Sequence, residues 1–491
     1  MGQDAMTQVV AGWDPARRCW TTQLSGTVVT VPPLAGELLV DDAARDAASR
    51  DLGRLVTHRP GAVLRPATAE DVATMVRLCH DHHIPVAPQG THHQTQGQSL
   101  VRDGLVVDMT SLGAIRPPVD GVVDVDAGVL WSDLVRTLAG PKLAFAGGLT
   151  GYVPLSVGGT LSAGGISPNY RLGAQVDFVR RLQIVTGRGE IRWASETENP
   201  DLFAAALGGL GQVGIITRAE LALMSMPTQV RTWVLPLADA AAAFRIMRTL
   251  IRGGLLDEVY CMIMPPGMEL PGGGRNPAPT FLIHLARYEY DDGRYASADP
   301  VDGLDWTGPA QQEQLGYLDH ALKYSGIIDQ WRQAGWDERR KPWFDVFLAD
   351  SQIGDYVTST LSRMTPDDWS APHGEGFVLL FPHRAGAFRR PRLRLPEQQP
   401  DELIWLFDVL TCSEHDPEPG YAEAMLARNR DWIAAALARG GVVYPIGSHG
   451  FTAADWRRHY GPHWDAVVAT KQQFDPARIL TPGQGIAAAL P

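Results

Sequence analysis

The spacing of hydrophobic residues predicts a helix shortly after residue 68. Val72 and Cys79 belong to a set of apolar residues that recur every three or four positions, as on the buried face of a helix. Thr68 precedes this set, and Asp71 follows Thr68 by three residues, a spacing close to that of a helix-capping box. We therefore expect Thr68 to cap the helix and Cys79 to lie in the core.

Other parts of the first 225 residues have the patterns of short strands. Residues 122–128 alternate between apolar and polar, as in a half-buried strand, and residues 105–109 form a short apolar run. Residues 85–88 predict a strand that leads directly into a glycine-rich loop. Residues 179–193 contain two strand patterns around a glycine-containing turn, which predicts a hairpin.

The pattern changes after residue 226. Residues 237–251 form an alanine-rich amphipathic segment, which predicts a helix. Apolar runs interleaved with helical patterns predict strands at residues 259–263, 281–285, 377–381 and 403–407. This order is typical of an antiparallel sheet with helices on one face, so we expect a second domain here.

Composition narrows the classes of partner. A chain of 491 residues exceeds one simple core, so two domains are the natural expectation. The formal net charge of −12 argues against nucleic acid or an anionic membrane as a partner. The four cysteines lack the spacing of a zinc site or a disulfide framework, so we expect no metal.

The distribution of apolar residues also predicts where the protein resides. No apolar stretch reaches the roughly 20 residues that a transmembrane helix needs. The first 20 residues lack a basic start followed by an apolar run, which a signal peptide would have. Both observations predict a cytoplasmic protein, and a monomer and a homodimer both remain possible.

Three glycine-rich loops lie in the first half of the chain, at residues 90–99, 156–165 and 207–218. Glycine lets the main chain approach a ligand closely, so three such loops predict backbone folded around a large ligand. None of them is a G-x-G-x-x-G sequence that opens a helix, and the chain has no G-x-x-x-x-G-K sequence. Neither of these two nucleotide-binding motifs therefore applies.

In their order and spacing, these loops resemble the flavin domain of the vanillyl-alcohol-oxidase superfamily. The likeness includes residues 46–53 and 59–63, is strongest over 123–221, and returns at 474–484. Within the superfamily, the sequence is most similar to cytokinin dehydrogenases. The resemblance implies an α+β, two-domain FAD-binding fold of the p-cresol methylhydroxylase type, with an inserted substrate domain of antiparallel sheet and helices.

The resemblance also implies the domain boundaries and the cofactor site. Residues 1–225 and 441–491 would form the FAD-binding domain, and residues 226–440 the substrate domain. Clustered backbone N–H groups suit the pyrophosphate anion without any basic side chain. The residues expected to bind FAD are Pro88, Gln89, Gly90, Thr91, His92, His93, Gln94, Gln98, Ser156, Gly159, Thr160, Ser162, Ile166, Gly214, Ile216 and Gln484.

A covalent bond to the flavin is a further implication of the resemblance. Cytokinin dehydrogenases carry the bonded histidine five residues before the glutamine of a Gly-Gln pair, and here this count reaches His93. His92 stands where that pattern usually has glycine, so the alternative that His92 makes the bond stays open. Some relatives also use a cysteine at the position of Tyr152. We therefore expect a single covalent bond.

The position of the catalytic base departs from the family pattern. Gly151 stands where cytokinin dehydrogenases have an aspartate that takes the substrate proton. Asp345 is the best replacement, because an acid among aromatic neighbours can have a raised pKa; the alternative is an exposed carboxylate at a strand end. Tyr152 is a second candidate for orienting or deprotonating the substrate, unless it only packs over the flavin.

These residues together predict an FAD-linked oxidase or dehydrogenase. It would remove hydride from a C–N or C–OH bond of a small molecule, expected to be a specialised metabolite, and pass electrons to O2 or another acceptor. Because the usual base is missing, a redox-neutral cyclisation or isomerisation on an FAD-holding scaffold remains the alternative.

Overall fold

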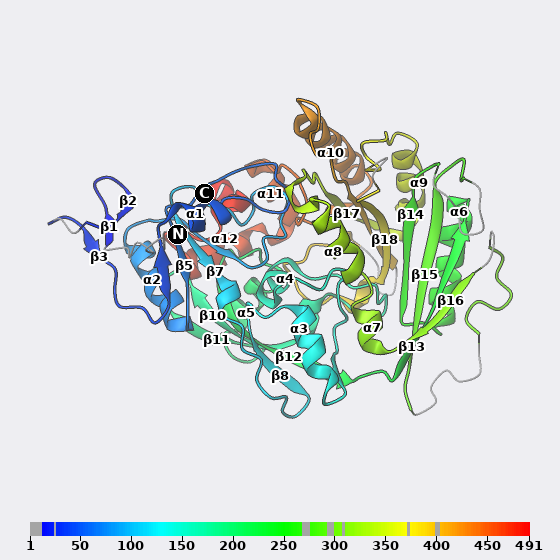
Figure 1. Cartoon of the computed structure of the whole chain (residues 1–491), viewed down its shortest axis with the longest axis horizontal. Coiled ribbons are helices and arrows are strands. Elements are labelled where there is room, and N and C mark those ends of the chain that lie inside the picture. Colours follow the sequence, from blue (N-terminus) through cyan, green and yellow to red (C-terminus); the bar gives the residue numbers. More distant parts are fainter. Residues whose placement is uncertain are drawn as a thin grey trace, which may run out of the picture.

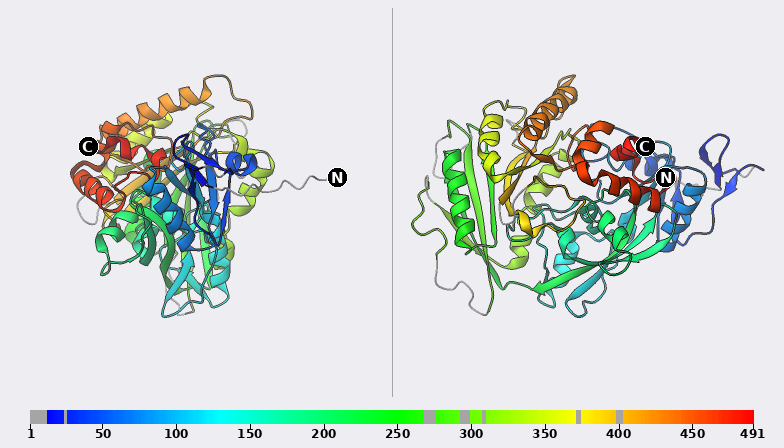
Figure 2. Two further views of the ribbon diagram at one scale, coloured as in Figure 1. Left: turned by 90° about the vertical axis from the view of Figure 1, so that its left-hand side faces the viewer. Right: turned by 180° about the vertical axis from the view of Figure 1, so that it is seen from behind.

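The structure is a computed structural model that describes residues 12–23, 26–267, 275–291, 299–306, 310–370, 374–397 and 403–491. Its elements form two lobes side by side (Figure 1). One lobe contains residues 12–23 and 26–225 together with the C-terminal helices, and the other is dominated by one large sheet. The view from behind shows the same division (Figure 2).

The first lobe begins with a small antiparallel sheet and a four-stranded mixed sheet. The small sheet consists of β1 (Gly12–Asp14), β2 (Cys19–Thr21) and β3 (Val29–Thr30). The mixed sheet has the order β4-β5-β7-β6, with β4 (Glu37–Leu39), β5 (Ala62–Arg65), β6 (Val86–Gln89) and β7 (Leu105–Asp108). The strands expected at 85–88 and 105–109 are therefore confirmed.

Helix α2 (Ala69–Asp81) begins as the sequence predicts. The Thr68 hydroxyl accepts from the Asp71 N–H at 3.3 Å, and the Asp71 carboxylate accepts from the Thr68 N–H at 3.2 Å. This reciprocal pair is a capping box. Cys79 is fully buried in the core that α2 shares with the mixed sheet, which confirms its structural role.

A second sheet of the first lobe carries two of the glycine-rich loops. It contains β8 (Val122–Asp126), β9 (Leu143–Phe145), β10 (Val179–Thr186), β11 (Ile191–Ala194) and β12 (Gly214–Ser225). The predicted hairpin is β10 and β11, which pair antiparallel. Short helices lie between the strands: α3 (Trp131–Ala139), α4 (Val157–Ala163) and α5 (Pro200–Ala206), after α1 (Asp42–Ala47) near the start.

The second lobe is built on an eight-stranded antiparallel sheet. Its order is β16-β13-β15-β14-β18-β19-β17-β20. The strands are β13 (Gln229–Leu237), β14 (Glu258–Met264), β15 (Thr280–Glu289), β16 (Gln311–Leu315), β17 (Phe344–Ala349), β18 (Phe377–Arg384), β19 (Leu403–Leu410) and β20 (Val442–Val443). All four apolar runs chosen as strands are strands. The sheet reaches Val443, close to the boundary expected at 440, which stays a prediction.

Helices pack on one face of this sheet and leave the other toward the first lobe. Helices α6 (Ala240–Gly253), α9 (Asp350–Leu361) and α10 (Tyr421–Leu437) share a hydrophobic core with inward residues such as Trp405 and Phe407. Leu406, between them, packs instead into the core of the first lobe. The helix expected from residue 237 begins at Ala240, because Leu237 still belongs to β13 and Asp239 is the N-cap.

Two helices complete the connections between the lobes. Helices α7 (Tyr317–Ala321) and α8 (Ser325–Gln333) run between the lobes (Figure 1). Within the described ranges, no helix is long and apolar enough to cross a membrane. The same part of the chain contains no group of three or more His, Cys, Asp or Glu side chains placed to hold a metal ion.

The C-terminal segment returns to the first lobe through α11 (Ala453–Tyr460) and α12 (Trp464–Phe474). The Val86 N–H donates to the Ile479 carbonyl at 2.8 Å, so the segment lies along strand β6. Asp475 is fully buried and accepts from the N–H groups of Ile479 and Leu480, while Lys471 pairs with its carboxylate at 2.8 Å. These contacts fix the turn that carries Gln484.

Candidate active site

A large cavity lies between the two lobes. Its empty space is ≈ 2120 Å³, counting the part that is open to solvent. All of the residues expected to bind FAD line this cavity, and so do Tyr152 and Asp345. The remaining lining residues come from the first lobe, from the cavity-facing side of the large sheet and from the segment around α8.

Residues 51–53 hold the double-histidine loop in place. The Leu52 N–H donates to the His92 carbonyl at 2.8 Å, and the Gly53 N–H donates to the Gln94 carbonyl at 3.2 Å. A Cβ at Gly53 would lie 1.9 Å from the carbonyl oxygen of Thr95, so only glycine permits this approach. The part of the family-like sequence at 46–53 is therefore the support of the loop.

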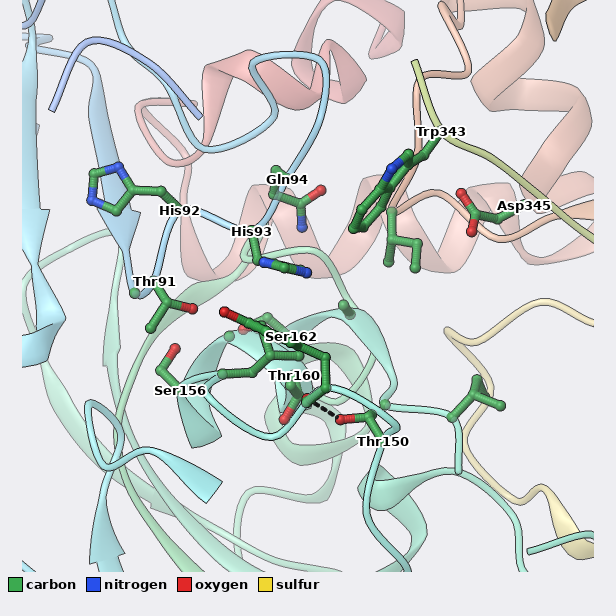
Figure 3. Close-up of a pocket in the computed structure, with 18 of the residues that line it drawn as sticks. Thr91, His92, His93, Gln94, Thr150, Ser156, Thr160, Ser162, Trp343 and Asp345 are labelled. Carbon is green, nitrogen blue, oxygen red and sulfur yellow. Dashed lines mark hydrogen bonds between the residues drawn. The ribbon is translucent and has the colours of Figure 1, made fainter. Parts of the chain in front are cut away.

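The two histidines of the loop point in different directions (Figure 3). The His92 ring turns away from His93, and its Nδ1 lies 3.2 Å from the Arg50 carbonyl oxygen. The His93 ring stacks on Tyr152 with centroids 4.5 Å apart and meets the edge of Trp343 at 5.3 Å. His92 also has φ = 56°, in the left-handed region where glycine is favoured. Glycine, which the family pattern has at this position, would adopt this conformation without strain.

The environment of His93 keeps its imidazole neutral. Burial, and then the positive charges of Arg332 and Lys341, lower the pKa of His93 to about 3. Lys341 is fully buried, and its ammonium group donates to three backbone carbonyls, with the contact to Arg339 at 2.9 Å. A neutral imidazole has a free nitrogen lone pair, which is what a nucleophile requires.

Backbone and hydroxyl groups form the part of the cavity that fits a pyrophosphate. The N–H groups of Thr91, His92 and His93 donate to no acceptor within the described ranges. A Cβ at Gly90 would lie 2.0 Å from the Ser156 hydroxyl oxygen, so loop and helix α4 approach closely there. Of the described residues that line the cavity, none is lysine or arginine. The donors for an anion are therefore main-chain groups.

Of the three hydroxyl side chains at residues 156–165 that are predicted to bind FAD, one is available to a ligand. The Ser156 hydroxyl makes no hydrogen bond with any described residue. The Thr160 hydroxyl donates to the Val157 carbonyl at 3.2 Å and accepts from an indole N–H, and Ser162 donates to the Gly158 carbonyl at 2.8 Å. These two side chains line the cavity, but their hydroxyl groups donate to carbonyl groups of helix α4.

Two of the four glutamines predicted to bind FAD, Gln98 and Gln484, differ in the same way. The amide of Gln98 donates to the Gly447 carbonyl at 2.7 Å and accepts from the Gln96 N–H at 2.8 Å, so it joins the loop to the C-terminal return. The amide oxygen of Gln484 is buried and has no hydrogen-bond partner among the described residues. Gln484 thus retains a polar atom for a ligand, whereas Gln98 acts on the loop.

The wall opposite the loops is a largely apolar sheet face. Tyr260 and Met262 of β14, Leu379 and Phe381 of β18, and Leu406 of β19 line it. Three indole rings, Trp331, Trp336 and Trp343, also line the cavity. Such a wall binds an organic substrate mainly by excluding water from apolar surface.

Asp345 lies in this wall and is not an exposed carboxylate. The residue is only 3% exposed, and no described N–H or hydroxyl group donates to either carboxylate oxygen. Burial raises the pKa of Asp345 to about 7. A carboxyl group with this pKa can take up or release a proton near neutral pH.

The sequence analysis missed the acid that stands directly opposite. Asp408 of β19 is the register partner of Asp345 of β17, is 6% exposed, and lines the same cavity. Burial, and then the charge of Asp345, raise the pKa of Asp408 well above its usual value. The available signal was an aspartate inside an otherwise apolar strand, next to the run 403–407.

Tyr152 and Gly151 are placed where the sequence suggests, but with different capacities. Burial raises the pKa of Tyr152 to about 12, and its hydroxyl is bonded to Arg332. This phenol is better suited to orienting than to deprotonating a substrate. Gly151 has no side chain that could replace the family aspartate. A Cβ there would meet only the Tyr324 ring, at 3.9 Å, so the position is open space.

Comparisons with known proteins agree with the cofactor side of the cavity. The family model described as FAD binding domain matches residues 60–195. The model described as Cytokinin dehydrogenase 1, FAD and cytokinin binding, matches residues 307–487. Cytokinin dehydrogenase 3 of Oryza sativa subsp. japonica is 30% identical over 481 residues, which cover 89% of this chain and 89% of that protein.

A bacterial relative and a solved structure extend the comparison. The uncharacterized oxidoreductase ORF5 in the fasciation locus of Rhodococcoides fascians is 28% identical, over 92% of this chain and 99% of its own length. The structure of 6-hydroxy-D-nicotine oxidase from Arthrobacter nicotinovorans superposes with a TM-score of 0.70 at 22% identity, covering 92% of this chain and 98% of that one. This likeness confirms the predicted α+β FAD-binding fold.

Proposed function

Since the chain belongs to the p-cresol-methylhydroxylase-type family of FAD-dependent oxidoreductases, together with the cytokinin dehydrogenases, we propose that it dehydrogenates a C–N or C–OH bond of a small molecule. We further propose that FAD is bonded covalently, and once, to His93. The observation that carries the proposal is the divergence of the two histidines. His93 faces the cavity as a neutral imidazole, whereas His92 is turned toward Arg50.

The residues present fit FAD. Free N–H groups at 91–93, the Ser156 hydroxyl and the buried Gln484 amide oxygen would hold its polar groups. Bound FAD would supply a two-electron acceptor for the hydride that leaves the substrate carbon. The second attachment used by some relatives has no counterpart, because Tyr152 stands where they have cysteine.

The large sheet would bind the substrate and accept its proton. Asp345 is placed in an apolar wall with its carboxylate unpaired, so it would take the proton from the N–H or O–H group as the C=N or C=O bond forms. The absence of lysine and arginine from the described lining argues against an anionic substrate. A neutral or cationic specialised metabolite fits this wall, with O2 or another compound as final electron acceptor.

The redox-neutral alternative loses its main argument. It depended on the lack of an acid at Gly151, and Asp345 supplies a buried carboxyl group in the same cavity. The experiment is an anaerobic screen of amines and alcohols in which the absorbance of oxidised flavin is followed. We expect at least one compound to bleach the flavin. A compound that is converted to an isomer while the flavin stays oxidised would contradict the proposal.

A further inference from the structure

The two carboxyl groups of Asp345 and Asp408 form an unusual pair within the cavity. They face each other across adjacent antiparallel strands, β17 and β19, in direct register. Residues directly opposite on one face of such a sheet have their Cβ atoms roughly 4.5–5.5 Å apart. Neighbouring residues on the same strands, Phe344 and Phe407, point into the helix-covered core. The two acids therefore project together toward the cavity that the lobes share.

Among the described residues, no lysine or arginine side chain neutralises this pair. Both oxygens of Asp345 and Oδ1 of Asp408 lack a hydrogen-bond donor among the described residues. The nearby acid Glu375 is already paired with Arg339, and Lys341 is surrounded by backbone carbonyls. Like charges so close in an apolar wall cannot both ionise at modest cost, and a shared proton removes the conflict.

The other surroundings of the pair are neutral. The Tyr444 hydroxyl accepts from the Gly165 N–H at 3.1 Å, and burial raises its pKa, so the phenol stays protonated. Leu379 is the register partner of Asp408 on the far strand. A Cβ at Gly447 would lie 2.1 Å from Oδ2 of Asp345, so the main chain packs directly against this carboxyl group. The imidazole of His93, across the cavity, is also neutral.

We propose that Asp345 and Asp408 act as one acid–base unit, which holds a single shared proton in the resting enzyme and accepts the proton that the substrate loses. The proposal deepens, and rests on, the dehydrogenation proposed above. The substrate C–H bond breaks and its hydride, with the electron pair, goes to the flavin. The N–H or O–H bond breaks and its proton goes to the pair. The pair changes from a monoanion to the neutral diacid, and the substrate gains a C=N or C=O bond.

Sharing a proton can be tested without any substrate. In the FAD-loaded protein, infrared difference spectra between pH values follow the C=O stretch of protonated carboxyl groups. We expect a wild-type signal that is lost as the pH rises through about 7, the value to which burial raises the pKa of Asp345. In Asp345→Asn and in Asp408→Asn, the new amide can donate to the remaining carboxylate, so its titration should move to lower pH by roughly one unit or more.

A matched control assigns the signal. Burial also raises the pKa of Asp51 to about 6, outside the pair. Asp51→Asn should remove only its own contribution and leave the titration of the pair as in the wild type. If Asp408→Asn leaves the remaining carboxyl signals at their wild-type midpoints, the two groups share no proton and the proposal is wrong. The visible spectrum of the same samples reports bound FAD separately.

The proton-accepting role is tested with the compound that bleaches the flavin most strongly in the anaerobic screen. Each single asparagine variant should slow flavin reduction at least tenfold. In Asp408→Asn the rise of the rate with pH should move to lower pH, together with the titration of Asp345. The double variant should be about as slow as the worse single variant, since residues that act as a unit are not additive. Normal rate and pH profile in Asp408→Asn alone would overturn the pair. Normal behaviour in Asp345→Asn would instead overturn the base assigned under the proposed function.

Discussion

The two walls of the cavity are built by different means. The wall of the first lobe consists of main-chain N–H groups and close glycine contacts, at Gly53 and Gly90 for example. The wall of the second lobe consists of side chains that four neighbouring strands of one sheet, β14, β18, β19 and β17, project toward the cavity. Backbone recognition depends on a fixed local conformation, whereas a sheet face can change its side chains without changing its shape. We infer that the first wall defines the cofactor and the second defines the substrate.

The largest expected effect comes from a substitution in the wall of the first lobe, called the cofactor wall below. His93→Ala should abolish covalent attachment, so that acid precipitation leaves a colourless pellet and free FAD in the supernatant. His92→Ala is the matched control and should keep the flavin in the pellet, because the His92 ring faces Arg50. Flavin retained by His93→Ala and lost from His92→Ala would exchange the roles of the two histidines.

The next largest effect comes from a substitution in the wall of the second lobe, the substrate wall, which leaves the cofactor wall unchanged. Asp345→Asn should slow anaerobic flavin reduction at least tenfold, the lower end for a lost general base being roughly 10²-fold, with flavin content unchanged. Because burial raises the pKa of Asp345 to about 7, the wild-type rate should rise as the pH increases through 7 and the carboxylate forms. A pH-independent wild-type rate would count against Asp345.

A smaller effect concerns stability. Removing the two carboxyl groups should raise the melting temperature, although it slows flavin reduction. Burial raises the pKa of Asp345 and of Asp408 in the folded protein, so the folded state binds protons more tightly than the unfolded state. For Asp345, stability from this source is complete below about pH 4 and is lost as the pH rises through about 7, and for Asp408 the loss continues as the pH rises through its own raised pKa. The double asparagine variant should therefore melt at a higher temperature than the wild type at pH 8, with a smaller difference at pH 5. A lower melting temperature at pH 8 would show that the carboxyl pair stabilises the fold.

The smallest effect sharpens the cofactor wall. His92 has φ = 56°, and a left-handed conformation costs a non-glycine residue roughly 1–2 kcal/mol. His92→Gly should raise the free energy of unfolding by about 1 kcal/mol or less, because glycine also loses more entropy on folding. His92→Ala removes the same ring but keeps the Cβ, so it should show no gain. Equal melting temperatures for the two variants would remove the backbone explanation.

The same difference explains what the sequence could predict. The glycine loops, the capping box at Thr68 and the apolar strands are local patterns, and each was found where expected. Asp408 was missed because it becomes a partner of Asp345 only through the pairing of β17 with β19, across more than sixty residues of chain. The internal hydrogen bonds of Thr160 and Ser162 likewise depend on helix α4. This helix could not be predicted, because it is short and its sequence is glycine-rich.

The most direct test of the account is peptide mass spectrometry of the acid-precipitated wild-type protein. We expect one FAD adduct per chain, on the peptide that contains both histidines, and we expect fragmentation to place it on His93. An adduct on His92 would contradict the assignment of the loop. Stoichiometric FAD that is wholly released by acid would contradict the covalent bond, and a protein purified without any flavin would contradict the reading of the entire cavity.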